Sequence, residues 1–232
     1  AALCAEQTGP PSVANAGPNA TYSWTITNGS LSFPNASSVT FTASGLAPVT
    51  LTVTVSNPGC SVTSAKSVTV NALPAATITP SGSTTFCAGG SVTLTASAGA
   101  SYLWSNGATT QSIVVSATGN YSVTVTNASG CSTISAPTSV TVNAATSISQ
   151  QPQSVTIPKN TATTLSVAAS GTGTLTYQWY KGTSPSTATP IGGATSSSYT
   201  TPKLTKGTYT YWVRVTGTCG VANSTTATVN AQ

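Results

Sequence analysis

The sequence contains no histidine, no aspartate and no methionine, and Glu6 is its single acidic residue. General acid–base catalysis near neutral pH needs an imidazole or a tuned carboxylate, and a serine or cysteine nucleophile needs a neighbouring base. Sites for hard cations need several carboxylates, and the five cysteines are too scattered for a zinc site. The sequence therefore predicts a protein that is not an enzyme, with no catalytic, cofactor-binding or metal-binding residues and no cofactor.

Positive charge is also sparse, because six lysines and arginines are spread over 232 residues. The formal net charge of +5 comes from the shortage of acids and not from a basic cluster, so we expect no nucleic-acid partner. No apolar run reaches the roughly 18 residues of a membrane-spanning helix, and no basic segment precedes an apolar stretch near the amino end. We expect no membrane insertion and no signal peptide, as in a mature chain or a fragment.

Apolar residues alternate with threonine and serine along most of the chain. Leu51, Val53 and Val55 alternate with threonines, and the same period recurs over residues 92–97 and 121–126. A period of two is typical of strands with one face in a core and the other in water, and β-branched threonine suits the outer face. No stretch shows helical spacing, so the predicted fold class is all-β.

The chain also repeats itself. The phrase Ser67–Asn71 (SVTVN) returns as Ser139–Asn143, and a relative, Ala227–Asn230 (ATVN), lies near the end. An aromatic pair with a tryptophan lies upstream of each phrase, at Trp24, Trp104 and Trp179. We predict three domains, 1–73, 74–145 and 146–232, whose short joints leave neighbouring domains in contact.

One tryptophan in each unit, several short strands and a late tyrosine are the pattern of an immunoglobulin-like (Ig-like) sandwich. The third unit resembles an Ig domain in Leu165, Trp179 and the segment Gly207–Tyr211 (GTYTY). Tyr209 falls at the position of the tyrosine corner. Leu165 and Tyr211 stand where antibody-type domains carry the cysteines of their inter-sheet disulfide, so that bridge is absent.

The second unit resembles the Ig-like and PKD-like repeats of large secreted bacterial surface proteins and adhesins. The resemblance lies in Phe86–Leu94 (FCAGGSVTL), Tyr102–Gly107 (YLWSNG) and the later Gly130 and Cys131. The first unit, with Ala20–Ile26 (ATYSWTI), resembles a PKD-like variant of these repeats, without the acidic phrase of typical PKD domains. The resemblance implies tandem Ig-like β-sandwiches arranged as a rod at the surface of a cell.

Two pairing schemes fit the five cysteines. Pairing within units joins Cys4 to Cys60 and Cys87 to Cys131, and leaves Cys219 free. In Ig strand order the members of such a pair lie at opposite ends of a strand about 17–20 Å long, whereas bridged Cα atoms lie within about 7 Å. Pairing between units joins Cys4 to Cys131 and Cys87 to Cys219, with Cys60 bonded to a unit further upstream. The strand order favours the second scheme, and the first stays open.

The two ends of the chain differ from the middle. A strand near residues 76–79 precedes Cys87, while three residues precede Cys4, so we expect the domain 1–73 to lack its first strand. Either the chain is a fragment, or its open edge accepts a strand from a neighbouring protomer. Ile157 lies near the position that corresponds to Cys4 and Cys87 in the third unit, which then needs no such bond.

Aromatic residues divide into core and surface groups. We predict that the tryptophan of each repeat packs in a core. Alternate residues of the strand near 207–215 point to opposite faces, which leaves an outward group that we predict as an interface: Trp212, Arg214, Tyr180 and Gln178. Three interpretations remain for this group: an arginine stacked on tryptophan at a monomer surface, a contact with a neighbouring subunit, or a platform for glycans.

The sequence thus predicts a structural and adhesive segment of an extracellular bacterial surface fibre, stalk or filament built from disulfide-stabilised Ig-like repeats. Its expected partners are neighbouring repeats or protomers of the same protein, surface glycans, or a host or matrix protein. The alternative is a binding module that grips a glycan or a protein through the exposed aromatic face of the third domain. A third interpretation is an accessory region of a secreted enzyme.

Overall fold

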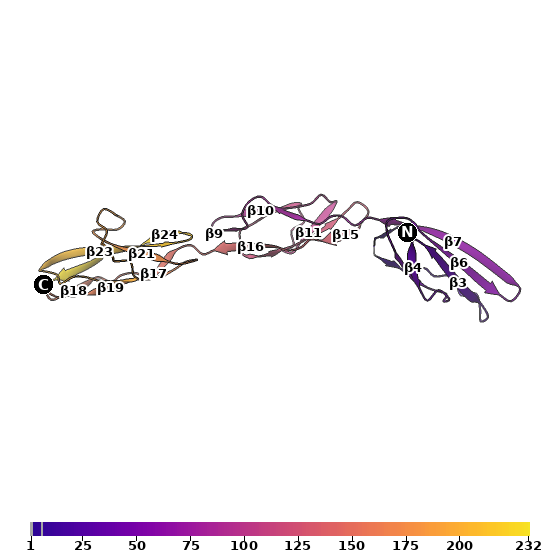
Figure 1. Cartoon of the computed structure of the whole chain (residues 1–232), viewed down its shortest axis with the longest axis horizontal. Helices are drawn as coiled ribbons and strands as arrows, with labels where there is room; N and C mark the ends of the chain where they lie inside the picture. The colour runs from indigo at the N-terminus through magenta and orange to yellow at the C-terminus, as the bar shows by residue number, and fades with distance from the viewer. Residues whose placement is uncertain (1, 6) are drawn as a thin grey trace. The chain divides into compact units, whose positions relative to one another are not determined.

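The computed structural model describes residues 2–5 and 7–232, and all regular elements of this part of the chain are β-strands (Figure 1). The strands form several small sheets that pack as tandem Ig-like β-sandwiches, which confirms the predicted fold class. No helix in the described part is long and apolar enough to cross a membrane. Glu6, the single acidic residue, lies outside the described residues.

The chain divides into two compact units. The first contains Ala1–Ser81, Thr93–Ile113 and Asn120–Thr138, and the second contains Gly82–Val92, Val114–Gly119 and Ser139–Gln232. The division passes through the strands between residues 78 and 143, which contribute to both units. The boundaries of the three domains stay a prediction.

The amino-terminal sandwich consists of strands β1 to β7. They are β1 (Ala2–Cys4), β2 (Thr8–Gly9), β3 (Thr21–Thr27), β4 (Gly29–Ser32), β5 (Thr40–Ala43), β6 (Val49–Asn57) and β7 (Cys60–Asn71). One sheet has the order β1-β7-β6-β3 and the other has the order β2-β5-β4. Within the first sheet β1 runs parallel to β7, and the other neighbours are antiparallel.

The core of this sandwich follows directly from the period of two. Val49, Leu51 and Val53 on β6 are buried, and the threonines between them face the other way. Trp24 on β3 packs in the same core and donates its indole N–H to the carbonyl of Ala36 at 2.9 Å. A buried indole N–H needs such an acceptor. This bond therefore gives the N–H a partner and also fixes the orientation of the ring.

The middle strands are β8 to β16. They are β8 (Ile78–Pro80), β9 (Thr85–Cys87), β10 (Val92–Ala96), β11 (Ser101–Trp104), β12 (Ser112–Val115), β13 (Gly119–Tyr121), β14 (Val123–Thr126), β15 (Ser132–Ile134) and β16 (Thr138–Asn143). Their sheets have the orders β12-β10-β8, β11-β14-β15 and β13-β16-β9. Trp104 is buried and donates its indole N–H to the carbonyl of Thr110 at 2.8 Å.

The carboxy-terminal sandwich consists of strands β17 to β25. They are β17 (Ser147–Gln150), β18 (Val155–Ile157), β19 (Thr164–Ser166), β20 (Ala168–Ser170), β21 (Thr176–Lys181), β22 (Ser198–Thr200), β23 (Gly207–Gly217), β24 (Gly220–Asn223) and β25 (Ala227–Ala231). The largest sheet has the order β18-β25-β23-β21, with β24 paired to β23. Two-stranded sheets β17-β20 and β19-β22 complete this part.

Two features of the carboxy-terminal sandwich confirm predictions from the sequence. Trp179 is buried in its core and donates its indole N–H to the carbonyl of Ser196 at 2.9 Å. The Tyr209 hydroxyl donates to the carbonyl of Thr205 at 3.2 Å and also contacts the Thr205 hydroxyl at 2.9 Å. A tyrosine hydroxyl bonded to the backbone a few residues upstream is the tyrosine corner of Ig domains.

The outer faces of the sheets carry pairs of hydroxyl groups on neighbouring strands. Their oxygens lie 2.8–3.0 Å apart in the pairs Thr54–Thr63, Thr95–Ser112, Thr126–Ser132, Ser147–Ser170 and Thr164–Thr200. Such cross-strand pairs stabilise a sheet modestly, by about 0.2–1 kcal/mol each. The abundant threonine and serine therefore solvate these faces and also bridge strands.

A parallel edge pair recurs three times along the chain. Strand β1 pairs with β7, β9 pairs with β16, and β18 pairs with β25, each in parallel. A further strand lies along the other sheet in two of the three cases, because β8 pairs with β10 and β17 pairs with β20. Strand β2 pairs with β5 alone among the described residues, and so forms the end of its sheet.

Candidate interaction sites

The structure joins Cys4 to Cys131 by a disulfide, with Cα atoms 5.5 Å apart. Cys4 ends β1 and lies opposite Asn71 at the end of β7. Cys131 follows the turn between β14 and β15, whose Gly130 has a φ of 81°. The bond therefore connects the end of an edge strand to the tip of a hairpin 127 residues later in the sequence.

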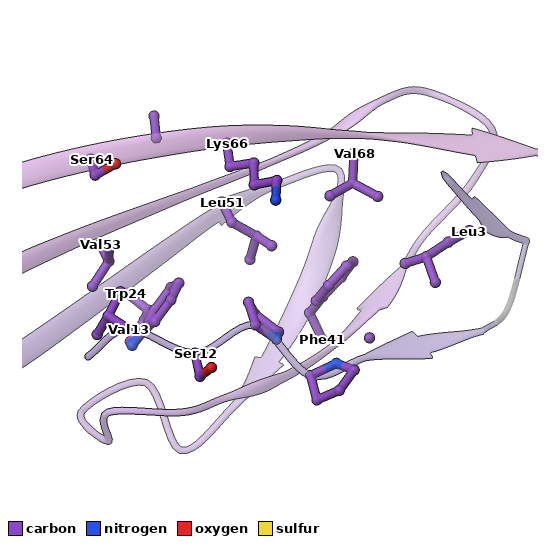
Figure 2. A pocket seen from close by; sticks show the side chains of 14 residues that line it. Leu3, Ser12, Val13, Trp24, Phe41, Leu51, Val53, Ser64, Lys66 and Val68 are labelled. Atoms are coloured by element: carbon purple, nitrogen blue, oxygen red, sulfur yellow. The ribbon is translucent and has the colours of Figure 1, made fainter. Parts of the chain in front are cut away.

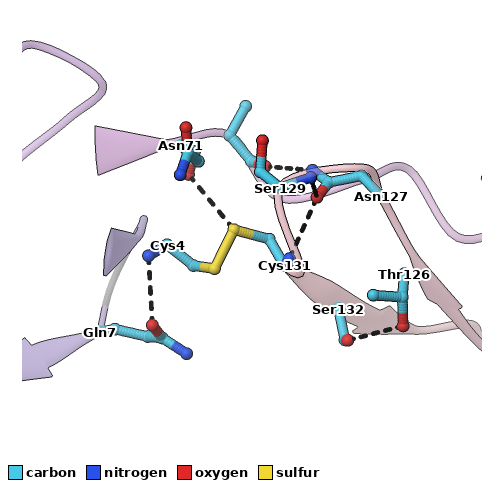
Figure 3. The surroundings of a disulfide bond; sticks show 9 residues. Cys4, Gln7, Asn71, Thr126, Asn127, Ser129, Cys131 and Ser132 are labelled. Carbon is cyan, nitrogen blue, oxygen red and sulfur yellow. Dashed lines mark hydrogen bonds between the residues drawn. A yellow bond between two sulfur atoms is a disulfide. The ribbon is translucent and has the colours of Figure 1, made fainter. Parts of the chain in front are cut away.

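The Asn127 side chain braces the same hairpin, as Figure 3 shows. Its Oδ1 accepts hydrogen bonds from the backbone N–H groups of Ser129 and Cys131, both at 3.0 Å. Its Nδ2 donates to the carbonyl of Ala72 at 2.8 Å, just beyond the end of β7. The disulfide and this amide together hold the hairpin against the end of the amino-terminal sandwich.

The second disulfide, between Cys87 and Cys219, repeats this arrangement with Cα atoms again 5.5 Å apart. Cys87 ends β9 opposite Asn143, and Cys219 lies at the tip of the β23–β24 hairpin beside Gly220. Here the bracing side chain comes from the segment after β16 and not from the hairpin. The Thr146 hydroxyl donates to the carbonyl of Gly220 at 2.9 Å, and the Thr146 N–H donates to the carbonyl of Cys219 at 3.3 Å. Both hairpins are thus tied to the residues that follow a last strand.

The remaining cysteine, Cys60, is exposed and forms no disulfide. It begins β7 and lies opposite Asn57 across the turn that joins β6 to β7. Gly59, which precedes it, has a φ of 86°, and Gly130, which precedes Cys131, has a φ of 81°. The bond to an upstream unit that the sequence predicts for Cys60 involves no residue of this chain and stays a proposal.

The prediction that Trp212 is exposed on the outer face is wrong, because its side chain is 0% exposed. The indole stacks on the Tyr180 ring, with centroids 4.5 Å apart and an interplanar angle of 12°. It also donates its N–H to the carbonyl of Ser186 at 3.1 Å. Alternation does turn Trp212 away from the core between the sheets, but the connection between β21 and β22 folds over it.

The other members of the predicted interface are also engaged within the sandwich. Arg214 donates from Nε to Oδ1 of Asn223 at 3.0 Å, and its guanidinium carbon lies 5.7 Å from the Trp212 ring centroid. Gln178 donates from Nε2 to the carbonyls of Trp179 and Ile191, both at 2.9 Å. The structure brings the four residues together on one face of the β21–β23 pair, but it leaves no exposed aromatic platform there.

The amino-terminal sandwich contains an open apolar groove of about 470 Å³. Figure 2 shows the Phe41, Leu51 and Val68 side chains lining it, with Leu3 at one end and Trp24 toward the other. The segment 9–13 forms one rim and the segment 64–66 of β7 forms the other, where Lys66 reaches inward. The groove thus opens between the outer edge of β2 and the edge of β7 that β1 leaves uncovered.

Titratable and metal-ligating groups are scarce in the described part of the chain. Residues 2–5 and 7–232 contain no cluster of three or more cysteine, histidine or acidic side chains that could hold a metal ion. Burial raises the pKa of Tyr211, and the neighbouring Tyr199 and Tyr209 raise it further. Burial also raises the pKa of Tyr199. Tyr211 belongs to the buried core of the carboxy-terminal sandwich, and Tyr199 and Tyr209 are partly buried and pack against that core.

Comparison with known proteins supports the fold. A family model described as "Domain of unknown function (DUF8696)" matches residues 145–232. No curated protein matches the sequence significantly.

Among solved structures, a glutamate-to-alanine variant of titin Ig domains I67–I69 is similar over 99% of this chain and 94% of its own, with a TM-score of 0.52 and 14% identity. The eight amino-terminal Ig domains of Down syndrome cell adhesion molecule are similar over 100% of this chain and 35% of theirs, with a TM-score of 0.53 and 14% identity. At this identity the likeness shows tandem Ig-like domains and nothing further.

Proposed function

We propose that this chain is a structural and adhesive segment of an extracellular bacterial surface fibre, stalk or filament built from Ig-like repeats. The observation that carries the proposal is the pair of disulfides, Cys4–Cys131 and Cys87–Cys219, each of which ties a strand end to a distant hairpin. In the chain-entropy model, closing loops of this length is worth about 5 kcal/mol per bond. We infer that such bonds serve to limit bending where one repeat follows another, as a stalk or fibre requires.

The surface supports the same role. Threonine and serine cover the outer faces, and 3% of the residues are charged. Disulfides form and persist in oxidising compartments, which favours a secreted protein that acts at the cell surface. The inventory of side chains offers no general base beside a nucleophile, which favours a role without catalysis. The partners proposed are neighbouring repeats or protomers, with glycans or a host or matrix protein as adhesive targets.

The test combines disulfide mapping with small-angle X-ray scattering. We expect peptides from the unreduced protein to show both bonds, and we expect scattering from an elongated particle. A variant with Cys4→Ser and Cys131→Ser should scatter as a more flexible chain, while the control Cys60→Ser should scatter as the parent does. A compact particle, or a map that joins Cys87 to Cys131, contradicts the proposal.

The groove supports a second candidate function, the acceptance of a β-strand from a neighbouring protomer. Strands β8 and β17 lie along β10 and β20, whereas β2 has no such neighbour among the described residues. An edge with free backbone groups beside an apolar groove suits strand addition, in which main-chain bonds give affinity and side-chain pockets give specificity. The segment 74–81 (PAATITPS), which contains β8, is a natural probe because it already forms such an edge strand.

The probe tests the groove directly. We expect a peptide with this sequence to bind saturably and to change the fluorescence of Trp24, which lines the groove. A peptide with aspartate in place of its isoleucine is the control, since a charge should not enter an apolar groove. Equal binding of the two peptides, or no binding, contradicts strand acceptance and leaves the role of the disulfides intact.

A further inference from the structure

Several asparagines lie in the sequence pattern of an N-glycosylation acceptor, Asn-x-Ser or Asn-x-Thr with x other than proline: Asn19, Asn28, Asn35, Asn120, Asn127 and Asn223. A chain so rich in serine and threonine produces this pattern by chance, so the sequence alone selects none of them. The structure distinguishes them, because an acceptor needs an exposed place with room for a bulky sugar and a side-chain amide that no other group holds.

Hydrogen bonds already hold several of these side chains. Asn127 braces a disulfide-bonded hairpin through both of its amide atoms, and Oδ1 of Asn223 accepts the bond from Arg214. Asn28 donates from Nδ2 to the carbonyl of Pro48 at 3.0 Å. A sugar on Nδ2 of Asn127 or Asn28 would therefore break a hydrogen bond that the fold uses.

Asn19 and Asn35 remain, and they lie in turns of the same construction. Each turn begins with a residue of positive φ and continues as Pro-Asn-Ala, over 17–20 and over 33–36. In each, the N–H of the alanine donates to the carbonyl of the first residue at 3.2 Å. That first residue is Gly17 in one turn and Phe33 in the other. Asn120, by contrast, lies inside strand β13.

Phe33 stands at a place where the other two sandwiches have glycine. Its φ is 56°, a left-handed conformation that is rare and strained for a bulky side chain. In every sandwich the core tryptophan donates its backbone N–H to the carbonyl of the residue after this place, which is Pro34, Ala108 or Ala194. The residues before Ala108 and Ala194 are Gly107 and Gly193, with φ of 86° and 74°.

Burial within the protein does not offset the strain at Phe33, since its side chain is 80% exposed. The turn is nevertheless held firmly, because Trp24 bonds to it twice. The backbone N–H of Trp24 donates to the carbonyl of Pro34, and its indole N–H donates to the carbonyl of Ala36, both at 2.9 Å. A fixed turn thus presents an exposed aromatic ring and, two residues later, the exposed Asn35.

We propose that Asn35 is a glycosylation site whose sugar packs on the Phe33 ring. Within residues 2–5 and 7–232 the side chains of Asn35 and Ser37 form no hydrogen bond, so both are available to a transferase. A pyranose has an apolar face of C–H groups, which suits an aromatic face, and residues two apart in the chain lie within about 7 Å. The sugar covers the exposed ring, which accounts for phenylalanine at a glycine place.

The transfer needs an activated sugar, here a hexose carried on a diphosphate, such as UDP-glucose, and an asparagine glycosyltransferase as catalyst. The Nδ2 atom of Asn35 attacks the anomeric carbon of the hexose. The bond from this carbon to the phosphate oxygen breaks, the diphosphate leaves with the electron pair, and Nδ2 releases one proton to the transferase. The product is an N-linked hexose, and nothing is oxidised or reduced. The site is separate from the disulfides that carry the proposed function.

The experiment treats the folded chain with UDP-glucose and a purified asparagine glycosyltransferase. The enzyme is chosen as one that modifies a synthetic peptide with the sequence of residues 32–38 (SFPNASS). Peptide mapping by mass spectrometry then locates the hexose. We expect it on Asn35, and we expect none on Asn127 or Asn223 while the protein is folded. Modification of the peptide without modification of Asn35 in the protein overturns the proposal.

Stability tests the role of the ring. In chemical denaturation the sugar should raise the folding equilibrium constant of the unchanged protein about three- to tenfold, the usual range for an aromatic contact. Phe33→Ala keeps the acceptor and the strained backbone place, so its sugar should bring no gain. Asn35→Gln leaves Asn19 as the acceptor in the matching turn and should also gain nothing. An equal gain in Phe33→Ala, or no gain in the unchanged protein, overturns the proposal.

A further variant checks the strain itself. Without sugar, Phe33→Gly should unfold at a higher denaturant concentration than the unchanged protein, because glycine adopts a positive φ freely. A lower midpoint contradicts the strain at this place and overturns the reason given for the phenylalanine. The same samples yield the disulfide map, so failure of the glycosylation site and failure of the proposed function are read separately.

Discussion

The Trp212 indole lies flat against the Tyr180 ring, on the side of the β21–β23 pair that faces away from the main core. The connection after β21 covers the pair, and the carbonyl of Ser186 accepts the indole N–H. The two rings therefore form a second, smaller core on the outside of the sheet. The sequence pattern assigned Trp212 to a binding interface, whereas in the structure its side chain is buried and stabilises the sandwich.

The first prediction is that Trp212→Ala destabilises the carboxy-terminal sandwich by about 3–5 kcal/mol, because it removes a fully buried aromatic side chain. Chemical denaturation followed by circular dichroism measures the loss. The control is Val221→Ala, an exposed residue of the same sandwich, which should change stability by less than about 0.5 kcal/mol. An unchanged stability for Trp212→Ala, combined with loss of binding to a glycan panel, would restore the exposed-platform interpretation.

The second prediction concerns the brace beside the first disulfide. Asn127→Ala removes three hydrogen bonds of one side chain at the hairpin that carries Cys131. We expect the Cys4–Cys131 bond to be reduced faster by dithiothreitol than in the unchanged protein, because the hairpin opens more often. Alkylation of released thiols followed by peptide mapping measures the rate. The Cys87–Cys219 bond of the same molecules is an internal control, and an equal acceleration of both bonds argues against a local effect.

The third prediction concerns the tyrosine corner. Tyr209→Phe should lower stability by about 1 kcal/mol, since it removes the hydrogen bond to the Thr205 carbonyl while keeping the ring. Thr205→Val keeps that carbonyl and removes the hydroxyl contact alone, so its cost should be smaller. Thermal unfolding of the two variants distinguishes the contributions. A larger loss for Thr205→Val would show that the hydroxyl contact, and not the backbone bond, stabilises the corner.

The fourth prediction concerns alkaline pH. The pKa of Tyr211 is raised in the folded state by burial, and by the charges of Tyr199 and Tyr209. Above the ordinary phenol pKa of about 10 the unfolded chain loses this proton first, so stability falls as pH rises through the folded-state pKa. Denaturation curves at pH values from about 8 to about 11 measure how stability changes with pH. Tyr211→Phe should flatten it, and an identical slope in the variant contradicts the assignment.

The sequence predicted the parts of the fold that follow from local periodicity. Alternation at Leu51 and Val53 placed the core face correctly, and the spacing to Trp24, Trp104 and Trp179 located buried rings whose N–H groups all find backbone acceptors. The position of Tyr209 relative to its strand also sufficed to predict its corner. In each case neighbouring residues along one strand determine the outcome.

Predictions failed where a distant segment determines the environment. Alternation gives the direction of Trp212 but not what covers it, and the cover comes from residues 183–190, outside the strand. The available signal was the length of that connection, which carries Pro185, Pro190 and Gly192–Gly193 and is longer than the turn after Trp104.

The use of hydroxyl side chains in place of charged ones on the outer faces affects how susceptible the protein is to proteases. Trypsin-like proteases cut after lysine and arginine, and between Lys66 and Lys159 the sequence has neither. The side chains that take their place on the strands, such as Thr95 with Ser112 and Thr126 with Ser132, solvate the sheets without offering a cleavage site. Digestion should therefore leave this long stretch uncut even after the protein is unfolded.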